Sequence, residues 1–155
     1  MNNFKKVAIL FAAFVGLAGV VFTTVAPLSA AEKKVHYVAV HVDQKDPRVM
    51  NMALNNVANI NKYYASKGEK VVVEVVAYGP GLHMYRTDTS PVKARIEKMG
   101  LEFDNLKFSA CGNTHRKMSS KAGKKISLLP EAKMVPSGVV QLITLQEKGY
   151  AYVRP

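Results

Sequence analysis

The stretch Val71-Val72-Val73-Glu74-Val75-Val76-Ala77 decides the fold of this chain, because it is the strongest strand signal in the sequence. Tyr78-Gly79-Pro80-Gly81 follows directly, breaks the strand sharply and predicts a tight loop. Glu74 is the one acid inside the apolar run, and we expect it at an edge-facing or interface position rather than in catalysis.

Strand and helix signals alternate on both sides of this stretch. Residues 35–42 are β-branched and mostly apolar on both faces, so we expect them to form the first and central strand. The other predicted strands are 106–110, 134–135 and 150–153. Helices are predicted from Asp46-Pro47 to Gly68, from Ser90-Pro91 to Gly100, from a cap at Asn113 or Thr114, and from Ser137 to Gly149 with Val139, Leu142 and Ile143 on one face.

This alternation predicts a single α/β domain. Strand-helix-strand units with right-handed crossovers give a three-layer α/β/α fold around a mainly parallel five-stranded sheet. Sites in such sheets lie beyond the carboxyl ends of the strands. Those ends carry His41 and Asp43, the 78–83 loop, and Cys111 with His115. If the three strands are neighbours, Cys111 lies beside the glycine loop.

The first 31 residues read as a secretory signal peptide. Lys5 and Lys6 precede an uncharged apolar run, and Ser29-Ala30-Ala31 fits a small-x-small cleavage rule, so we expect cleavage after Ala31 and a domain at 32–155. We therefore expect the protein in the periplasm. The alternative is an uncleaved anchor, because the run approaches the ~20 residues that span a bilayer, and only then is a membrane a partner.

The predicted cleavage and export affect how the net charge and the single cysteine are interpreted. Removing two lysines and no acid lowers the formal charge from +11 to +9. One cysteine excludes an internal disulfide, so in an oxidising compartment the thiol is buried, paired between chains or reactive. Export and the absence of aromatic residues among Lys121, Lys124 and Lys125 argue against nucleic acid as a partner.

Cys111 lies just before a predicted helix N-terminus, in a segment, 105–130, without any Asp or Glu. The free amides and the helix dipole favour an anion, and Gly112 allows the backbone to approach closely. Such surroundings lower the pKa of a thiol, whereas burial raises it and makes the cysteine an inert packing residue. A reactive Cys111 and a packed Cys111 therefore remain two distinct hypotheses.

Four ordered motifs resemble the DsrE/DsrF-like (YchN-like) family and together span essentially all of 32–155. They are Val75-Val76-Ala77-Tyr78-Gly79-Pro80-Gly81-Leu82, Phe108-Ser109-Ala110-Cys111-Gly112-Asn113-Thr114, Val135-Pro136-Ser137-Gly138-Val139 and Leu145-Gln146-Glu147-Lys148-Gly149-Tyr150-Ala151-Tyr152. The resemblance implies a three-layer fold, a homotrimer or homohexamer, and sulfur carried as a persulfide on Cys111. The pattern departs at Tyr78, where related sequences often show His, and in the predicted export.

The leading hypothesis is a persulfide carrier or sulfurtransferase that works without a cofactor. Cys111 takes sulfane sulfur from a donor and passes it to an acceptor molecule or thiol protein, with the Gly79, Pro80 and Gly81 loop shaping the pocket. The amides of Gly112, Asn113 and Thr114 hold negative charge. His115 or Arg116 is the candidate proton donor or anion clamp, unless both are merely solvated in the first helical turn.

Two other classes of function remain open. His41, His83, Cys111 and His115 are residue types that bind zinc or copper, although their spacing does not demand a metal. The other hypothesis is a non-catalytic oligomeric binding module, in which Cys111 is packed and Lys121, Lys124 and Lys125 contact an acidic partner.

Overall fold

The structure is a computed structural model that describes residues 34–155. The predicted signal peptide and its cleavage site lie outside the described residues. Within 34–155 no helix is both long and apolar enough to cross a membrane.

Strands and helices alternate along the whole described part of the chain. The strands are β1 Val35–Val42, β2 Lys70–Ala77, β3 Leu106–Cys111, β4 Ala132–Val135 and β5 Ala151–Val153. The α-helices are α1 Pro47–Ser66, α2 Lys93–Glu102, α3 Gly112–Lys121 and α4 Gly138–Glu147, and a 3-10 helix, η1, spans Gly79–Tyr85. The predicted tight loop after the strongest strand is thus a 3-10 helix.

The five strands form one sheet in the order β4-β3-β2-β1-β5, and every neighbouring pair is parallel. The predicted single α/β domain is confirmed, with a sheet that is all parallel rather than mainly parallel. The prediction that 35–42 is the central strand was wrong. β2 is central, and β1 lies between β2 and the short edge strand β5, because Ala39 pairs with both Glu74 and Tyr152.

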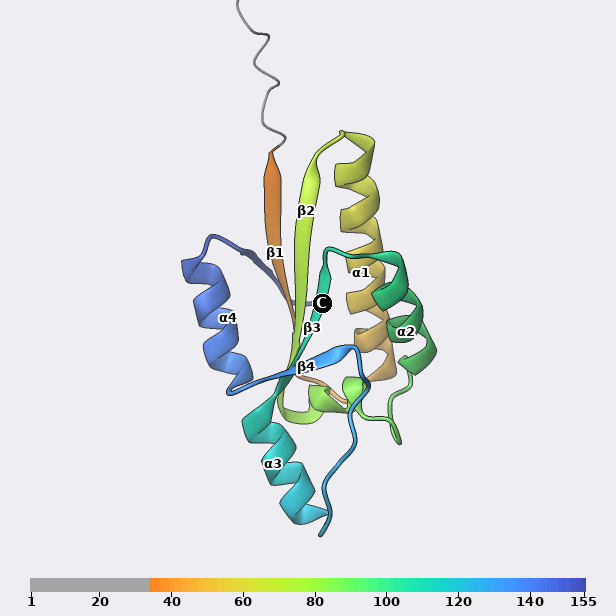
Figure 1. Ribbon diagram of the computed structural model, residues 1–155, viewed down its shortest axis with the longest axis vertical. Helices are drawn as coiled ribbons and strands as arrows, with labels where there is room; N and C mark the ends of the chain where they lie inside the picture. Colours follow the sequence, from red (N-terminus) through yellow and green to blue (C-terminus); the bar gives the residue numbers. More distant parts are fainter. Residues whose placement is uncertain (1–33) are drawn as a thin grey trace, which may run out of the picture. The chain divides into compact units, whose positions relative to one another are not determined.

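The helices cover the two faces of the sheet unequally. α1 and α2 lie on one face, α4 lies on the other, and α3 extends beyond the carboxyl end of β3 (Figure 1). The larger core lies on the α1 and α2 face and includes Val40, Val73 and Phe108. The core on the α4 face contains few residues, among them Val76 and Leu142. One face is therefore a full hydrophobic core and the other is a narrow strip beneath one helix.

Glu74 lies on the α4 face of the central strand and is buried. Its Oε1 accepts a hydrogen bond from Ser109 Oγ at 2.6 Å and one from Gln141 Nε2 at 2.7 Å. The expected edge-facing position was wrong, because the strand is central. Burying this carboxylate is tolerated since both neighbours donate to it, and Gln141 ties α4 to the sheet.

Local signals placed most helix starts correctly. Asp46 caps α1 by accepting from the Arg48 amide at 2.8 Å, as predicted. The cap of α3 is Cys111 itself, not Asn113 or Thr114, because β3 runs one residue further than expected and passes directly into the helix.

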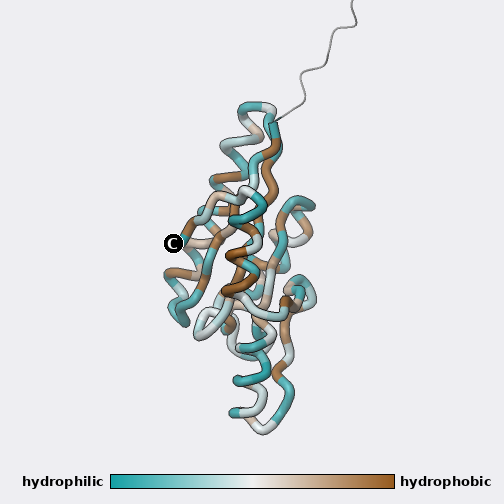
Figure 2. Tube along the Cα trace, turned by 90° about the vertical axis from the view of Figure 1, so that its left-hand side faces the viewer, coloured by the Kyte–Doolittle hydropathy of each residue, from teal (hydrophilic) through white to brown (hydrophobic). Residues whose placement is uncertain are grey.

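The predicted apolar face of α4 was only partly correct. Leu142 is buried, together with Leu145, but Val139 and Ile143 are 50% and 49% exposed. Within residues 34–155 the main contacts of α4 are with strands, so residues on its outer side have no other described helix to pack against (Figure 2).

Gly81 sets how closely η1 approaches the end of β1. A Cβ at Gly81 would lie 2.2 Å from the carbonyl oxygen of Val42, which is backbone and has no room to move. This close approach holds the glycine loop against the carboxyl edge of the sheet.

We expect Gly81→Ala to lower the free energy of unfolding by about 3 kcal/mol, at the upper end of the usual cost of overpacking. Urea denaturation followed by circular dichroism measures this loss. Gly100→Ala is the control, because the Cβ there meets only the flexible side chain of Glu131 and alanine favours a helix. Equal stability of the two variants would contradict the role given to Gly81.

Candidate functional site

The carboxyl ends of β1, β2 and β3 meet at one edge of the sheet. His41 lies near the end of β1, Tyr78 follows β2, and Cys111 ends β3. The three strands are neighbours, which is the arrangement that the sequence analysis required for Cys111 to lie beside the glycine loop.

Cys111 lies where two helices begin. Its Sγ accepts from the backbone amide of Thr114 in α3 at 3.5 Å. The first residue of α4, Gly138, comes so close that an added Cβ would lie 3.1 Å from Cys111 Cβ and 2.8 Å from Tyr78 Cβ. The thiol is buried, with 4% of the residue exposed. Two helix N-termini, each with free amides, therefore approach one sulfur atom.

Burial raises the pKa of the Cys111 thiol, but hydrogen-bond donors around the sulfur outweigh it. The Thr114 side chain contributes most, followed by the backbone amides of Thr114, Gly138 and Asn113. The net result is a pKa below the ordinary value of a cysteine. A lowered pKa increases the fraction of thiolate, which is the nucleophilic form.

Of the residues that follow Cys111, Gly112 and Asn113 hold α3 in place, whereas Arg116 adds a positive charge near the site. A Cβ on Gly112 would lie 3.0 Å from the Val135 carbonyl oxygen, so glycine permits α3 to pack against the segment that leads into α4. The Asn113 amide donates to the Pro136 carbonyl at 3.3 Å. Arg116 is exposed and its guanidinium donates to the Asn113 side chain, which holds a cation over the start of α3.

His41 and Tyr78 form the β1 side of the site. Their rings stack with centroids 4.6 Å apart, and His41 Nδ1 hydrogen-bonds with the hydroxyl of Tyr152 at 2.7 Å. His41 Nε2 is buried without a hydrogen-bond partner. Burial lowers the pKa of His41, against the nearby Asp43 carboxylate, which raises it. A neutral imidazole with one unused nitrogen thus lies at the edge of the site.

The other two histidines named by the sequence have hydrogen-bond partners other than the thiol. His115 is buried, with Nε2 2.7 Å from the Ile126 carbonyl oxygen, so it is not a solvated residue of the first helical turn. His83 Nδ1 is 2.8 Å from Thr89 Oγ1. Across residues 34–155 no three His, Cys, Asp or Glu side chains are grouped to hold a metal ion, which leaves the four-residue metal site without support.

The glycine loop joins the site through Thr114. Gly79 has a left-handed backbone, with φ of 53°, and its amide donates to Thr114 Oγ1 at 2.9 Å. Gly79, Pro80 and Thr114 line a hollow of about 460 Å³ between η1 and α3. Gly81 does not line this hollow but packs against β1. Thr114 is therefore shared between the hollow and the cysteine.

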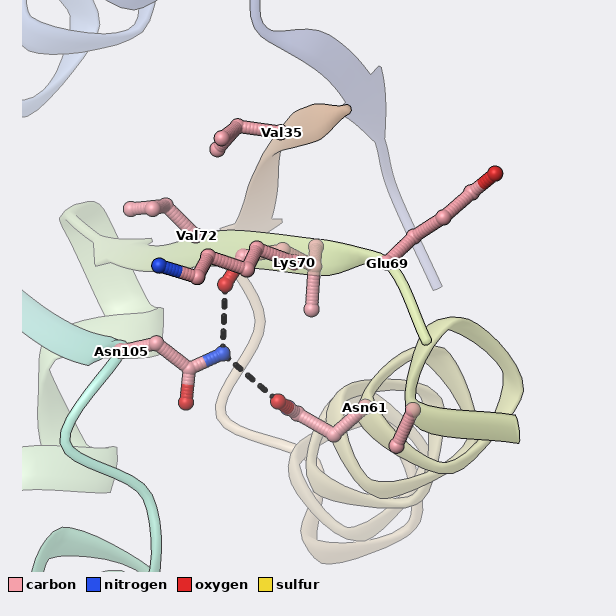
Figure 3. A pocket seen from close by; sticks show the side chains of 8 residues that line it. Val35, Asn61, Glu69, Lys70, Val72 and Asn105 are labelled. Atoms are coloured by element: carbon pink, nitrogen blue, oxygen red, sulfur yellow. Dashed lines mark hydrogen bonds between the residues drawn. The ribbon is translucent and has the colours of Figure 1, made fainter. Parts of the chain in front are cut away.

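A second hollow, of about 310 Å³, lies at the amino edge of the sheet (Figure 3). Asn105 Nδ2 donates there to Asn61 Oδ1 at 2.7 Å and to the Val71 carbonyl at 2.6 Å, which fastens the start of β3 to α1 and β2. This hollow lies at the opposite end of the strands from Cys111.

Sequence reasoning missed Gly138 and Tyr152 as parts of this site. Both come from segments that reach the sheet edge only through tertiary structure, from the start of α4 and from the edge strand β5. One available signal pointed to Gly138: it follows Ser137 at the start of a predicted helix, shortly after a predicted strand, and so resembles the Cys111-Gly112 junction.

Comparisons with known proteins agree with the overall fold. A search of curated proteins found no match. The chain is 30% identical to MTH1491 from Methanobacterium thermoautotrophicum, a protein of unknown function with a solved structure; the match has a TM-score of 0.65 and covers 77% of this chain and 99% of that one. The model of the DsrE/DsrF-like family matches residues 33–155. The chain belongs to the DsrE/DsrF-like family.

Proposed function

We propose that the protein is an exported sulfur carrier that holds sulfane sulfur as a persulfide on Cys111. Family membership is consistent with a role in sulfur relay. The observation that carries the proposal is the position of the sole thiol of the chain between two helix N-termini, where its pKa is lowered despite burial.

The chemistry needs no oxidant. The Cys111 thiolate attacks the outer sulfur of a donor persulfide, R–S–SH; an S–S bond to Cys111 forms while the donor S–S bond breaks, and RS⁻ leaves with the electron pair and takes up a proton. An acceptor thiolate then attacks the outer sulfur on Cys111. That sulfur moves to the acceptor with its proton, and the Cys111 thiolate is regenerated as the leaving group.

Thr114, Gly138 and Arg116 support the two anionic states of this cycle. Amides that stabilise the thiolate also make it a better leaving group, because both roles place negative charge on the same sulfur atom. The exposed Arg116 guanidinium is the nearby cation suited to clamp an anionic donor. His115 has no part in this proposal, because its Nε2 faces the Ile126 carbonyl.

A second candidate is a binding module in which Cys111 only packs. The 4% exposure of the cysteine favours it. A maleimide distinguishes the two candidates, since a packed thiol reacts only after unfolding.

Export rests on the sequence of 1–31, where two lysines precede an apolar run that ends in small residues. Export makes the sulfur donor and the acceptor periplasmic molecules or thiol proteins. The proposed persulfide role also explains why a single cysteine without a disulfide partner persists in an oxidising compartment, because the thiol is needed there to carry sulfur.

We also propose a homotrimer or homohexamer that uses the outer side of α4. Val139, Val140 and Ile143 are 50%, 55% and 49% exposed on this helix. Such a concentration of apolar side chains on one exposed helix is characteristic of a protein interface. It lies on the helix whose N-terminus faces Cys111, so assembly also shields the site.

Treatment with inorganic polysulfide should add sulfur to the wild-type protein and none to Cys111→Ser, because Cys111 is the only thiol. Intact-mass spectrometry detects the added sulfur, and dithiothreitol should remove it. No added mass on the wild type, or equal loading of the serine variant, would refute the carrier proposal.

The alkylation rate of folded protein with iodoacetamide should reach its half-maximum at a pH below that of the unfolded chain. The folded thiol has a lowered pKa, so its thiolate persists as the pH falls. Thr114→Val should move this midpoint to higher pH by removing the largest favourable contribution. Thr87→Val, on an exposed loop, is the control; an unchanged midpoint in Thr114→Val would contradict the assignment.

The double variant Val139→Glu and Ile143→Glu should be monomeric, because the two residues share one face of α4 and charges there are costly to bury. Light scattering after size exclusion measures the mass. Leu101→Glu changes an 89% exposed residue on α2 and serves as the control. A monomeric wild type, or a double variant that still assembles, would rule out this interface.

A further inference from the structure

The hollow between η1 and α3 carries an unusual distribution of charge. Three of the residues that line it are lysines, and none is Asp or Glu; we call it the lysine hollow, after Lys45, Lys117 and Lys121. Tyr78, Pro80 and Met118 contribute an apolar part of its wall. Lysine side chains from two separate segments, the loop after β1 and helix α3, thus line one partly apolar cavity.

The lysines have no acidic partner within residues 34–155, where none of the three makes an ion pair. The acids in the neighbouring loops pair instead with arginines. These pairs are Asp43 with Arg154, Asp46 with Arg48 and Asp88 with Arg86. The positive charge of the hollow is therefore not neutralised by the protein itself.

The size and lining of the hollow define the class of ligand that fits it. A volume of about 460 Å³ lies within the range of small-molecule sites. Three ammonium groups favour two or more negative charges, and the Tyr78, Pro80 and Met118 surfaces favour a carbon skeleton over a bare inorganic ion. The complementary ligand is an organic dianion.

The hollow adjoins Cys111 through two shared residues. Thr114 lines the hollow, and its amide donates to Cys111 Sγ at 3.5 Å. Tyr78 also lines it, and Tyr78 and Cys111 both lie against Gly138, where an added Cβ would meet the two side chains. A ligand held by the lysines is thus next to the walls that enclose the thiol.

We propose that the lysine hollow binds an organic dianion and directs anionic sulfur compounds to Cys111 in preference to neutral ones. The natural ligand is a sulfur compound only if the proposed function holds. Binding of the dianion itself does not depend on it.

The single cysteine allows a direct test with two disulfide reagents, dithiobis(nitrobenzoate), which is a dianion, and dithiodipyridine, which is neutral. In each case the Cys111 thiolate attacks the reagent disulfide, a mixed disulfide forms, and one aromatic thiolate leaves with the electron pair and is detected by its absorbance. The ratio of the two rates reports the preference for an anion and cancels changes in the intrinsic reactivity of the thiol.

Replacing Lys45, Lys117 and Lys121 by Gln should lower this ratio about tenfold, the lower end of electrostatic steering effects. The control replaces Lys62, Lys98 and Lys148, three exposed lysines outside the hollow, and removes the same net charge. Its ratio should stay close to that of the wild type. An equal fall in both triple variants, or no fall in the first, would overturn the proposal.

A binding measurement separates this proposal from the proposed function. Isophthalate, an aromatic dicarboxylate, should shift the amide NMR signals of Gly79 and Thr114 in Cys111→Ser, whereas neutral benzamide should not. If isophthalate binds to Cys111→Ser but the wild type accepts no sulfur, the proposed dianion site is supported and the sulfur-carrier proposal is refuted. If the wild type accepts sulfur but isophthalate does not bind to Cys111→Ser, the sulfur-carrier proposal is supported and the proposed dianion site is refuted.

Discussion

Parallel pairing of β1, β2 and β3 is the constraint on which the rest of this structure depends. Parallel strands place all their carboxyl ends at one edge, so segments more than thirty residues apart in the chain, at His41, Tyr78 and Cys111, become neighbours. Each loop at that edge must then fit beside the next. Gly81 meets this demand by allowing η1 to touch the backbone of β1, and Gly112 does so for α3 and the segment after β4.

The environment of Cys111 balances two opposing effects on the thiol. Burial disfavours the thiolate, whereas the Thr114 side chain and the amides at the starts of α3 and α4 favour it, and the second effect prevails. A short connection from β3 into α3 is responsible, because it makes Cys111 the last residue of the strand and the cap of the helix at once. The same residue therefore anchors the fold and carries the candidate chemistry.

The α4 face of the sheet shows how site and assembly are connected. Among residues 34–155 one helix covers it, and that helix is held by Leu142, Leu145 and the hydrogen bond from Gln141 to the buried Glu74. Its first residue, Gly138, faces Cys111, while Val139, Val140 and Ile143 face outward. The exposed apolar side of α4 and the amide that faces the thiol therefore belong to the same short helix.

The sequence by itself determined the order of strands and α-helices, the capped start of α1 and the α/β fold class. It also placed Cys111 at the carboxyl end of a strand. All of these follow from local periodicity and turn residues. The sequence misplaced the central strand and expected Glu74 at an edge-facing or interface position, because strand order is decided by tertiary packing and local pattern does not encode it. It also counted Val139 and Ile143 with the packed face of α4, because a hydrophobic pattern does not tell a buried side chain from one that is half exposed in the described part of the chain. Only the tertiary structure brought Gly138 to Cys111, set His41 against Tyr78, and gathered Lys45 with Lys117 and Lys121, since each of these contacts joins segments whose proximity is fixed by strand pairing and not by spacing along the chain.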